Sequence, residues 1–267
     1  MTRAEIHAQM LAKKSFLCVG LDTDPAKLPA ILNNEKNPVL SFNQAIIEAT
    51  QDLAVSYKPN LAFYEALGPG GWDTLQATLA AIPAEVFTIA DAKRGDIGNT
   101  ADAYARTFFH TYQFDSVTIN PYMGSDSVTP FLQYPGKWAI VLGLTSNQGA
   151  KDIQYLEAGG ERVYEATMRQ VANWGTADNT MFVVGATRPE ELKKIRQHYP
   201  DHFLLVPGVG AQGGSLADVY KNGANSLCGL LVNASRSILY ASSGADFAEA
   251  ARAEALRMQS EMAALLV

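Results

Sequence analysis

The stretch V-F-T-I-A-D-A-K-R-G-D-I-G-N-T, residues 86–100, begins as a short apolar run and ends in charged residues, glycines and a helical pattern. A run of this kind, rich in β-branched residues and followed by a loop and a helix, is typical of a buried parallel strand. Seven other runs have the same form, at 16–22, 55–60, 116–121, 138–144, 180–186, 203–209 and 226–232. Eight strand–helix units over about 250 residues predict an α/β protein with the (β/α)8 TIM barrel fold.

Helical patterns separate these runs. Apolar residues recur at helical spacing in 41–53, 73–81, 100–111, 161–174, 189–197, 215–222 and 246–264. The competing architecture is an open doubly wound sheet, but the GxGxxG turn expected after its first strand is not found here. No linker rich in Pro, Gly and Ser divides the sequence, so residues 1–267 are expected to form a single barrel domain.

The composition limits the partners and the location of the protein. The formal net charge is -6, so no general field attracts a nucleic-acid backbone. No segment approaches the roughly 20 apolar residues of a membrane span, and charged residues interrupt the N-terminal 15 residues, which excludes a signal-peptide core. We therefore expect a cytoplasmic protein with no nucleic-acid partner and no membrane partner.

The cysteines and histidines do not form a metal-binding pattern. Cys18 and Cys228 are too few for a disulfide framework and are not spaced as metal ligands, so they are expected to be buried thiols in a reducing compartment. The four histidines are scattered, with no HxH or HExxH arrangement. The sequence predicts no metal and no cofactor.

Alternation along the strands brings several charged side chains to one end of the barrel. Asp91 and Lys93 share one face of their strand and are expected to point into the carboxyl-terminal mouth, where barrel enzymes carry their active sites. Asp96 lies just beyond, in the loop that follows. The same reasoning places Lys58 and Asp22 at this rim.

A single Asp-x-Lys pair is often only an ion pair that closes a barrel rim. Four charges beside a glycine turn (Lys58, Asp91, Lys93 and Asp96) indicate a functional site instead. No serine or cysteine nucleophile with a partner histidine is evident, which argues against acyl transfer. In the helix that follows, Asn99 or Thr100 is expected to be the N-cap residue.

Two glycine-containing segments predict a phosphate site. The seventh run leads into V-P-G-V-G-A-Q-G-G at 206–214, and the eighth leads into N-A-S-R-S at 233–237. Glycines let backbone N–H groups approach an anion, and the loops after strands seven and eight commonly bind phosphate in this fold. Arg236 offers a forked donor for two phosphate oxygens, and Gln212 offers its amide. We expect a phosphorylated ligand.

The longest expected loop after a strand is T-S-N-Q-G-A-K-D-I-Q-Y-L-E-A-G-G, residues 145–160. A long polar loop at the carboxyl end of a barrel strand can act as a lid over the active site. It can equally be a tolerated surface insertion, and its length alone does not decide between the two.

The string D-A-K-R-G-D-I-G-N-T, with K-P-N upstream and P-G-V-G-A-Q-G-G and A-S-R-S downstream, resembles the orotidine 5′-phosphate decarboxylase family. The resemblance runs from Gly20 to Arg236. The residues of the D-A-K-R-G-D-I-G-N-T string and the length of the chain are similar to those of the longer bacterial subgroup of the family. It implies conversion of orotidine 5′-phosphate to UMP and CO2 without a cofactor. Lys58, Asp91, Lys93 and Asp96 would form the family's charge array, with Lys93 as the acid that protonates C6 of the pyrimidine.

The resemblance also implies a homodimer with shared active sites. Asp96, with Ile97 and Thr100, would complete the site of the neighbouring subunit. The other substrate contacts that it implies are Asp22 for the ribose hydroxyls, Ser146 for the pyrimidine edge, Pro207 for the base pocket, and Gln212 and Arg236 for the 5′-phosphate.

Two rival functions remain. A magnesium-dependent sugar-phosphate lyase or aldolase of the same barrel superfamily, such as hexulose-phosphate synthase, also carries Asp-x-Lys-x-x-Asp. The R-G-D-I-G wording favours the decarboxylase over that rival. A catalytically silent nucleotide-binding barrel would be expected to lose one or more charges of the array, and here all four are present.

Overall fold

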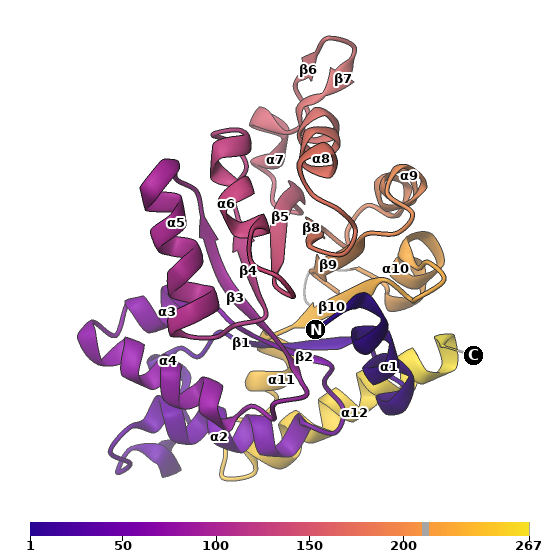
Figure 1. The fold of residues 1–267 in the computed structure, drawn as a ribbon. Helices are drawn as coiled ribbons and strands as arrows, with labels where there is room; N and C mark the ends of the chain where they lie inside the picture. The colour runs from indigo at the N-terminus through magenta and orange to yellow at the C-terminus, as the bar shows by residue number, and fades with distance from the viewer. Residues whose placement is uncertain (210–213, 267) are drawn as a thin grey trace.

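A closed barrel of eight parallel strands forms the centre of the computed structural model, which describes residues 1–209 and 214–266 (Figure 1). In chain order the strands are β1 (Leu17–Leu21), β2 (Ser56–Pro59), β3 (Phe87–Arg94), β4 (Ser116–Ile119), β5 (Trp138–Leu144), β8 (Thr180–Val184), β9 (Phe203–Pro207) and β10 (Leu230–Ala234). Each strand pairs with the next in this order, and β10 closes the barrel by pairing with β1 at Leu17↔Val232. The predicted (β/α)8 fold is confirmed.

Helices follow the strands and surround the barrel (Figure 1). They are α1 (Arg3–Lys13), α2 (Pro38–Thr50), α3 (Leu61–Glu65), α4 (Pro69–Ala81), α5 (Gly98–Arg106), α6 (Thr129–Leu132), α7 (Ala150–Ile153), α8 (Val163–Trp174), α9 (Pro189–His198), α10 (Leu216–Gly223), α11 (Arg236–Leu239) and α12 (Phe247–Leu265). A π-helical turn, Thr107–Thr111, continues α5. Within the described residues, no helix is long and apolar enough to cross a bilayer.

Local chemistry explains where several helices begin. The Asn37 side chain accepts a hydrogen bond from the Leu40 amide at 3.1 Å, and Pro38 occupies the first turn of α2. Ser215 caps α10 in the same way through the Asp218 amide. Side-chain acceptors satisfy amides that have no partner within the helix, and proline fits the first turn because it lacks an N–H.

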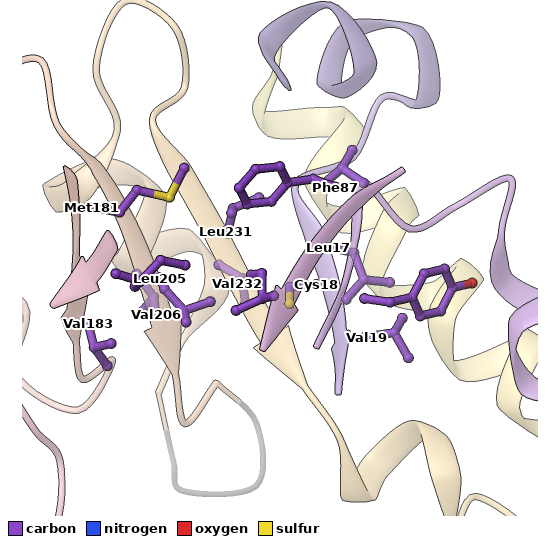
Figure 2. Packing of buried hydrophobic residues seen from close by; sticks show 14 of the residues in the cluster. Leu17, Cys18, Val19, Phe87, Met181, Val183, Leu205, Val206, Leu231 and Val232 are labelled. Atoms are coloured by element: carbon purple, nitrogen blue, oxygen red, sulfur yellow. The ribbon is translucent and has the colours of Figure 1, made fainter. Parts of the chain in front are cut away.

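The core consists of side chains from the barrel strands and from the helices packed outside them. All five residues of β1 and all five of β8 are buried. Figure 2 shows part of this cluster, with labelled side chains from β1, β3, β8, β9 and β10. Because both faces of a parallel strand are covered, these runs are apolar throughout instead of alternating. Burial of each large aliphatic side chain contributes roughly 1.5–3 kcal/mol.

Helix α1 covers the amino-terminal end of the barrel. The Arg3 guanidinium pairs with Asp178 just before β8 at 2.7 Å, and the His7 ring contacts the carbonyl of Leu227, before β10, at 3.0 Å. The Trp138 indole at the start of β5 donates to the Met1 carbonyl at 2.7 Å. These contacts leave the opposite, carboxyl-terminal end of the barrel for a binding site.

The predicted start of the eighth strand and the predicted cap of α5 were wrong. The eighth strand begins at Leu230 and not at residue 226, because Asn225 and Cys228 exchange backbone hydrogen bonds of 3.0 Å in a tight turn. Helix α5 begins at Gly98, with Ile97 at the N-cap position and no side-chain capping bond. Asn99 and Thr100 therefore lie inside the first turn and do not cap the helix.

The long segment after β5 has structure of its own. It contains α7 and a short antiparallel hairpin of β6 (Glu157–Ala158) and β7 (Glu161–Arg162), which projects away from the barrel beyond α8 (Figure 1). The sequence predicted a long polar loop here. It did not predict these short elements, because they contain only two to four residues each.

Candidate active site

A cavity of about 350 Å³ opens at the carboxyl-terminal ends of the barrel strands. Its walls come from residues at or just after the ends of β1, β2, β3, β4, β5, β8, β9 and β10. The predicted site residues that line it are Asp22, Lys58, Asp91, Lys93, Ser146, Pro207 and Arg236. The barrel therefore brings together side chains from distant parts of the sequence.

Strand β3 is irregular where it enters the cavity. Ala90 pairs with Val117 and Arg94 pairs with Ile119, so β3 contains extra residues between two points that are close together on β4. Lys93 lies inside this bulge with a φ of 48°, in the left-handed region that a side chain with a Cβ seldom adopts. The predicted regular alternation is wrong at this point, although Lys93 still reaches the cavity. Strained backbone of this kind is concentrated at functional sites.

Asp91 is the centre of an ion-pair array. Its Oδ2 lies 2.7 Å from Lys58 Nζ, and its Oδ1 lies 2.5 Å from Lys93 Nζ. The Thr118 hydroxyl also donates to Oδ1, at 3.1 Å. The two lysines differ in environment, because the side chain of Lys58 is 5% exposed and that of Lys93 is 51% exposed. Lys58 is thus a fixed buried cation, whereas Lys93 is accessible at the mouth of the cavity.

The array keeps its buried members charged. Burial by itself raises the pKa of the Asp91 carboxyl, but Lys58 and Lys93 outweigh it and lower that pKa to about 2. Burial lowers the pKa of Lys58, but Asp91 and then Asp22 outweigh it and raise that pKa above its usual value. Asp91 and Lys58 are therefore both ionised at neutral pH, and each stabilises the charged form of the other.

Asp22 lines the cavity and has one carboxylate oxygen without a hydrogen-bond partner in the described part of the chain. Its Oδ1 is buried, lies 3.7 Å from Lys58 Nζ and has no hydrogen-bond partner among the described residues. The backbone around it is held by Tyr240, whose hydroxyl donates to the Asp22 carbonyl at 3.1 Å and accepts from the Asp24 amide at 2.8 Å. Buried polar atoms are normally paired, so this oxygen is suited to accept a hydrogen bond from a ligand hydroxyl.

The end of the cavity near β9 and β10 contains Arg236, one of the two predicted phosphate contacts. Arg236 lines it at the start of α11, beside Ser235 and Ser237. Gly20 is required for this packing, since a Cβ there would lie 2.0 Å from the Ser235 hydroxyl oxygen. Gln212 lies outside the described residues, so its predicted role stays a prediction.

Three predicted site residues do not line this cavity. Asp96, Ile97 and Thr100 lie past the end of β3, and the Asp96 carboxylate accepts a hydrogen bond from the Ile97 amide at 2.9 Å. Ile97 is 47% exposed although it is a large aliphatic residue. Their position outside the cavity of their own subunit leaves the predicted contribution to a neighbour's site untested.

Sequence reasoning missed residues that hold the site in shape. Thr118 donates to Asp91 and accepts from the Lys93 amide at 2.9 Å, and Tyr240 fixes the backbone at Asp22. Arg94 pairs with Glu65 and lies over the ring of Tyr104 at 5.4 Å, which anchors the end of β3. The partners of Thr118 and Tyr240 are distant in the sequence, and no local motif indicates them.

The cavity is suited to reactions that develop negative charge on a bound anion. A half-exposed ammonium beside a carboxylate can stabilise a carbanion and donate a proton to it. Within residues 1–209 and 214–266, no group of three or more His, Cys, Asp or Glu side chains is placed to hold a metal ion.

Comparisons with known proteins agree with this geometry. Residues 15–253 match the family described as "Orotidine 5'-phosphate decarboxylase / HUMPS family". The protein named "Orotidine 5'-phosphate decarboxylase" of Flavobacterium johnsoniae is 55% identical to this chain, over 100% of the chain and 98% of the relative. The protein of the same name in Phocaeicola vulgatus is 52% identical to this chain, over 98% of the chain and 98% of the relative. The solved structure "Structure of Leishmania donovani OMP decarboxylase" matches with a TM-score of 0.85 and 38% identity, over 99% of each chain.

Proposed function

The chain belongs to the orotidine 5′-phosphate decarboxylase / HUMPS family, and from this premise we propose how its cavity carries out catalysis. The protein is a carboxy-lyase that converts orotidine 5′-phosphate to UMP and CO2, the last step of UMP synthesis. The observation that carries the proposed mechanism is the pairing of one buried carboxylate, Asp91, with Lys58 at 2.7 Å and with Lys93 at 2.5 Å.

Lys93 is proposed as the general acid. When the bond between C6 and the carboxylate breaks, CO2 leaves and the electron pair remains on C6 as a carbanion. The Lys93 ammonium stabilises that charge and then transfers a proton to C6, which leaves a neutral amine. Because the Lys93 side chain is 51% exposed, solvent can return the proton between turnovers. Asp91 would lie against the departing carboxylate, and Lys58 would hold Asp91 in place.

The rest of the cavity is proposed to bind the nucleotide. Asp22 would accept hydrogen bonds from the ribose hydroxyls through its unsatisfied oxygen. Ser146 and Pro207 line the cavity on the side of β5 and β9, where they would contact the pyrimidine. Arg236, with Gln212, would bind the 5′-phosphate. Binding energy gathered at the phosphate can then hold the pyrimidine against Lys93.

We expect Arg236→Ala to lower kcat/KM for orotidine 5′-phosphate by roughly 100-fold, because hydrogen bonds to a charged group contribute about 1.5–3 kcal/mol each. Steady-state kinetics of the decarboxylation measures this. Arg252→Ala, which removes an exposed arginine of α12 that pairs with Asp52, serves as the matched control and should leave kcat/KM unchanged. An Arg236→Ala enzyme with unchanged kcat/KM would exclude Arg236 from the phosphate site.

We propose that the protein is a homodimer in which Asp96, Ile97 and Thr100 complete the partner's site. Large apolar residues are exposed at this end of the barrel, namely Ile97 at 47%, and Tyr122 and Met123, after β4, at 83% and 49%. The two segments are adjacent, because a Cβ on Gly95 would lie 3.1 Å from the Asn120 carbonyl. Exposed apolar side chains often mark a protein–protein interface, and Asp96 beside them does not line the cavity of its own subunit. Both observations support a second copy of the chain as the partner.

Mixing Lys93→Ala and Asp96→Ala dimers under subunit exchange is expected to restore activity. In a heterodimer, one shared site carries both substitutions and the other carries neither. Random exchange at equal concentrations would make about a quarter of all sites intact. The decarboxylation rate is followed after mixing, with each variant alone as the control. Confirmed exchange without any recovery would show that Asp96 does not act in the partner's site.

The reaction itself is tested by ultraviolet absorbance after orotidine 5′-phosphate is added to the purified protein in excess EDTA. We expect conversion to UMP, since the proposed mechanism needs only the side chains of the array and no cofactor. The family description also covers a second branch, and a magnesium-dependent lyase or aldolase would behave differently. A folded protein that leaves the nucleotide intact, but acts on a sugar phosphate when magnesium is restored, would belong to that branch.

We also propose that residues 1–267 act as one domain in the cytoplasm. Helices from both ends of the chain, α1 and α12, pack against the same barrel, which supports a single domain. Cys18 and Cys228 are both free and buried, which is the usual state of cysteines in a reducing compartment.

A further inference from the structure

Gln154 holds the cavity wall that follows β5. Its side-chain oxygen accepts a hydrogen bond from the Thr145 amide at 2.9 Å, and its side-chain nitrogen donates to the Thr145 hydroxyl at 2.8 Å. Thr145, Ser146 and Asn147 are consecutive residues of the cavity lining, and the Thr145 hydroxyl also donates to Asn147 at 2.6 Å. Gln154 itself does not line the cavity, so any effect that it has on a ligand is transmitted through Thr145.

The backbone of Gln154 is fixed to the core. Its amide donates to the Ala150 carbonyl at 2.8 Å, and its carbonyl accepts from the Tyr164 amide at 3.1 Å. Tyr164 lies in the first turn of α8 and is 2% exposed. Gln154 therefore joins the end of β5, through its side chain, to a buried residue at the start of α8, through its backbone carbonyl.

The last hydrogen bond from the sheet to the peptide between Leu144 and Thr145 is at the Leu144 carbonyl, which accepts from the Gly185 amide at 2.9 Å, and the Thr145 amide has no sheet partner among the described residues. The pairing of β4 with β5 ends at Ile119↔Val141, and the register between β5 and β8 shifts between Leu142 and Leu144. The Thr145 amide bonds instead to the amide group of Gln154, which has the same hydrogen-bonding groups as a peptide. Gln154 thus extends the barrel wall past the end of the regular sheet.

Ser146 is confined from the opposite side by Gly185. A Cβ on Gly185 would lie 2.7 Å from the Ser146 Cβ and 2.9 Å from its backbone nitrogen, so the two backbones are in direct contact. Gln154 holds Thr145 on one side, and Gly185 contacts Ser146 on the other, so Ser146 has little freedom to move. The next residue after Gln154 adds to this anchoring, because the Tyr155 ring lies 5.0 Å from the Arg162 guanidinium and 4.7 Å from that of Arg188.

We propose that Gln154 is a positioning residue that sets Ser146 and its neighbours for the pyrimidine ring, through its paired hydrogen bonds with Thr145. The inference rests on the proposed function, in which Ser146 contacts the pyrimidine. It assigns a role to the segment after β5 that differs from that of a lid: one end of the segment is a rigid support for base recognition. The support acts at the base and not at the ribose phosphate, for which the proposed contacts are Asp22, after β1, and Arg236, in α11.

The test compares two competitive inhibitors of orotidine 5′-phosphate turnover, UMP and ribose 5-phosphate, which lacks the base. Gln154→Leu removes both hydrogen bonds to Thr145 and keeps a similar volume. We expect its inhibition constant for UMP to rise about tenfold, because Ser146 and its neighbours would no longer be held in place for the pyrimidine before binding, while that for ribose 5-phosphate stays within about twofold. Gln154→Glu keeps an acceptor for the Thr145 amide and should recover most of the UMP affinity.

Gln170→Leu, an exposed glutamine of α8, is the matched control and should bind both inhibitors normally. If Gln154→Leu does not fold, the two inhibition constants are measured on Gln154→Asn instead. Its shorter side chain cannot reach both the amide and the hydroxyl of Thr145. Equal losses for both inhibitors, unchanged UMP affinity, or a Glu variant as impaired as the Leu variant would each overturn the proposal. A wild-type protein that fails to decarboxylate the substrate would overturn the proposed function instead.

Discussion

Lys93→Ala is expected to lower the turnover of orotidine 5′-phosphate by roughly 10⁴-fold, because it removes both the charge that stabilises the carbanion and the proton that quenches it. UMP affinity should change little. The product has no C6 carboxylate and develops no charge at C6, so it gains little from the ammonium. In the variant, Asp91 still pairs with Lys58. Alanine has a Cβ, as lysine does, so the substitution does not change how readily residue 93 adopts its positive φ.

Single-turnover kinetics and UMP titration measure the two effects separately. Lys193→Ala, which removes an exposed lysine of α9, is the matched control and should behave as wild type in both. The result that contradicts the mechanism is a Lys93→Ala enzyme with turnover close to that of wild type. A variant that loses turnover and UMP affinity to the same extent would indicate that Lys93 contributes to binding in general and not to the chemical step.

Asp91→Asn is expected to lower both activity and stability. It leaves Lys58 buried with Asp22, at 3.7 Å, as its one remaining anionic partner among the described residues. Breaking a buried ion pair by removing one partner costs about 3–5 kcal/mol. The folded-state pKa of Asp91, about 2, lies below the unfolded value of about 3.9. Its ionisation therefore stabilises the wild-type fold above pH 4, and this contribution is lost as the pH falls from about 4 towards 2.

Urea unfolding at a series of pH values measures this dependence. The stability difference between wild type and Asp91→Asn should be largest near neutral pH and should shrink between about pH 4 and pH 2. Asp218→Asn, at an exposed position of α10, controls for general acid effects and should show no such trend. A difference that stays constant down to pH 2 would mean that Asp91 is not held ionised by the two lysines.

The barrel could be predicted from the sequence because its signal is repeated. Eight apolar runs of similar length alternate with helical patterns, so an error in one unit does not change the fold. The boundary of a single unit is less secure. The run at 226–232 is apolar enough to resemble a strand, but the turn between Asn225 and Cys228 occupies its first half. Hydrophobic periodicity does not distinguish a strand from an adjacent buried turn.

The candidate site was predicted in part, and for a specific physical reason. Lys58 follows from regular strand alternation, since β2 pairs with β1 without a shift of register. Asp91 lies at the start of the β3 bulge, but its bridge to Asn60 keeps the register with β2, so alternation still places it correctly. Lys93 was assigned to the cavity from an alternation that the β3 bulge interrupts, and it reaches Asp91 by a different backbone path. Supporting contacts such as that of Gln154 with Thr145 could not be predicted, because they depend on how the chain returns after leaving the strand.

The hydroxyl of Thr118 sets a condition for moving this chemistry into another scaffold. It accepts from the Lys93 amide and donates to Asp91, so one atom of β4 holds both the bulge and the carboxylate of β3. A designer who grafts only Asp-Ala-Lys onto a new barrel would leave that amide without an acceptor, and a regular strand would aim the lysine elsewhere. The transferable unit is therefore a pair of adjacent strands with a serine or threonine opposite the bulge. Genome searches for such sites gain specificity by requiring both the Asp-Ala-Lys strand and the hydroxyl residue on its neighbour.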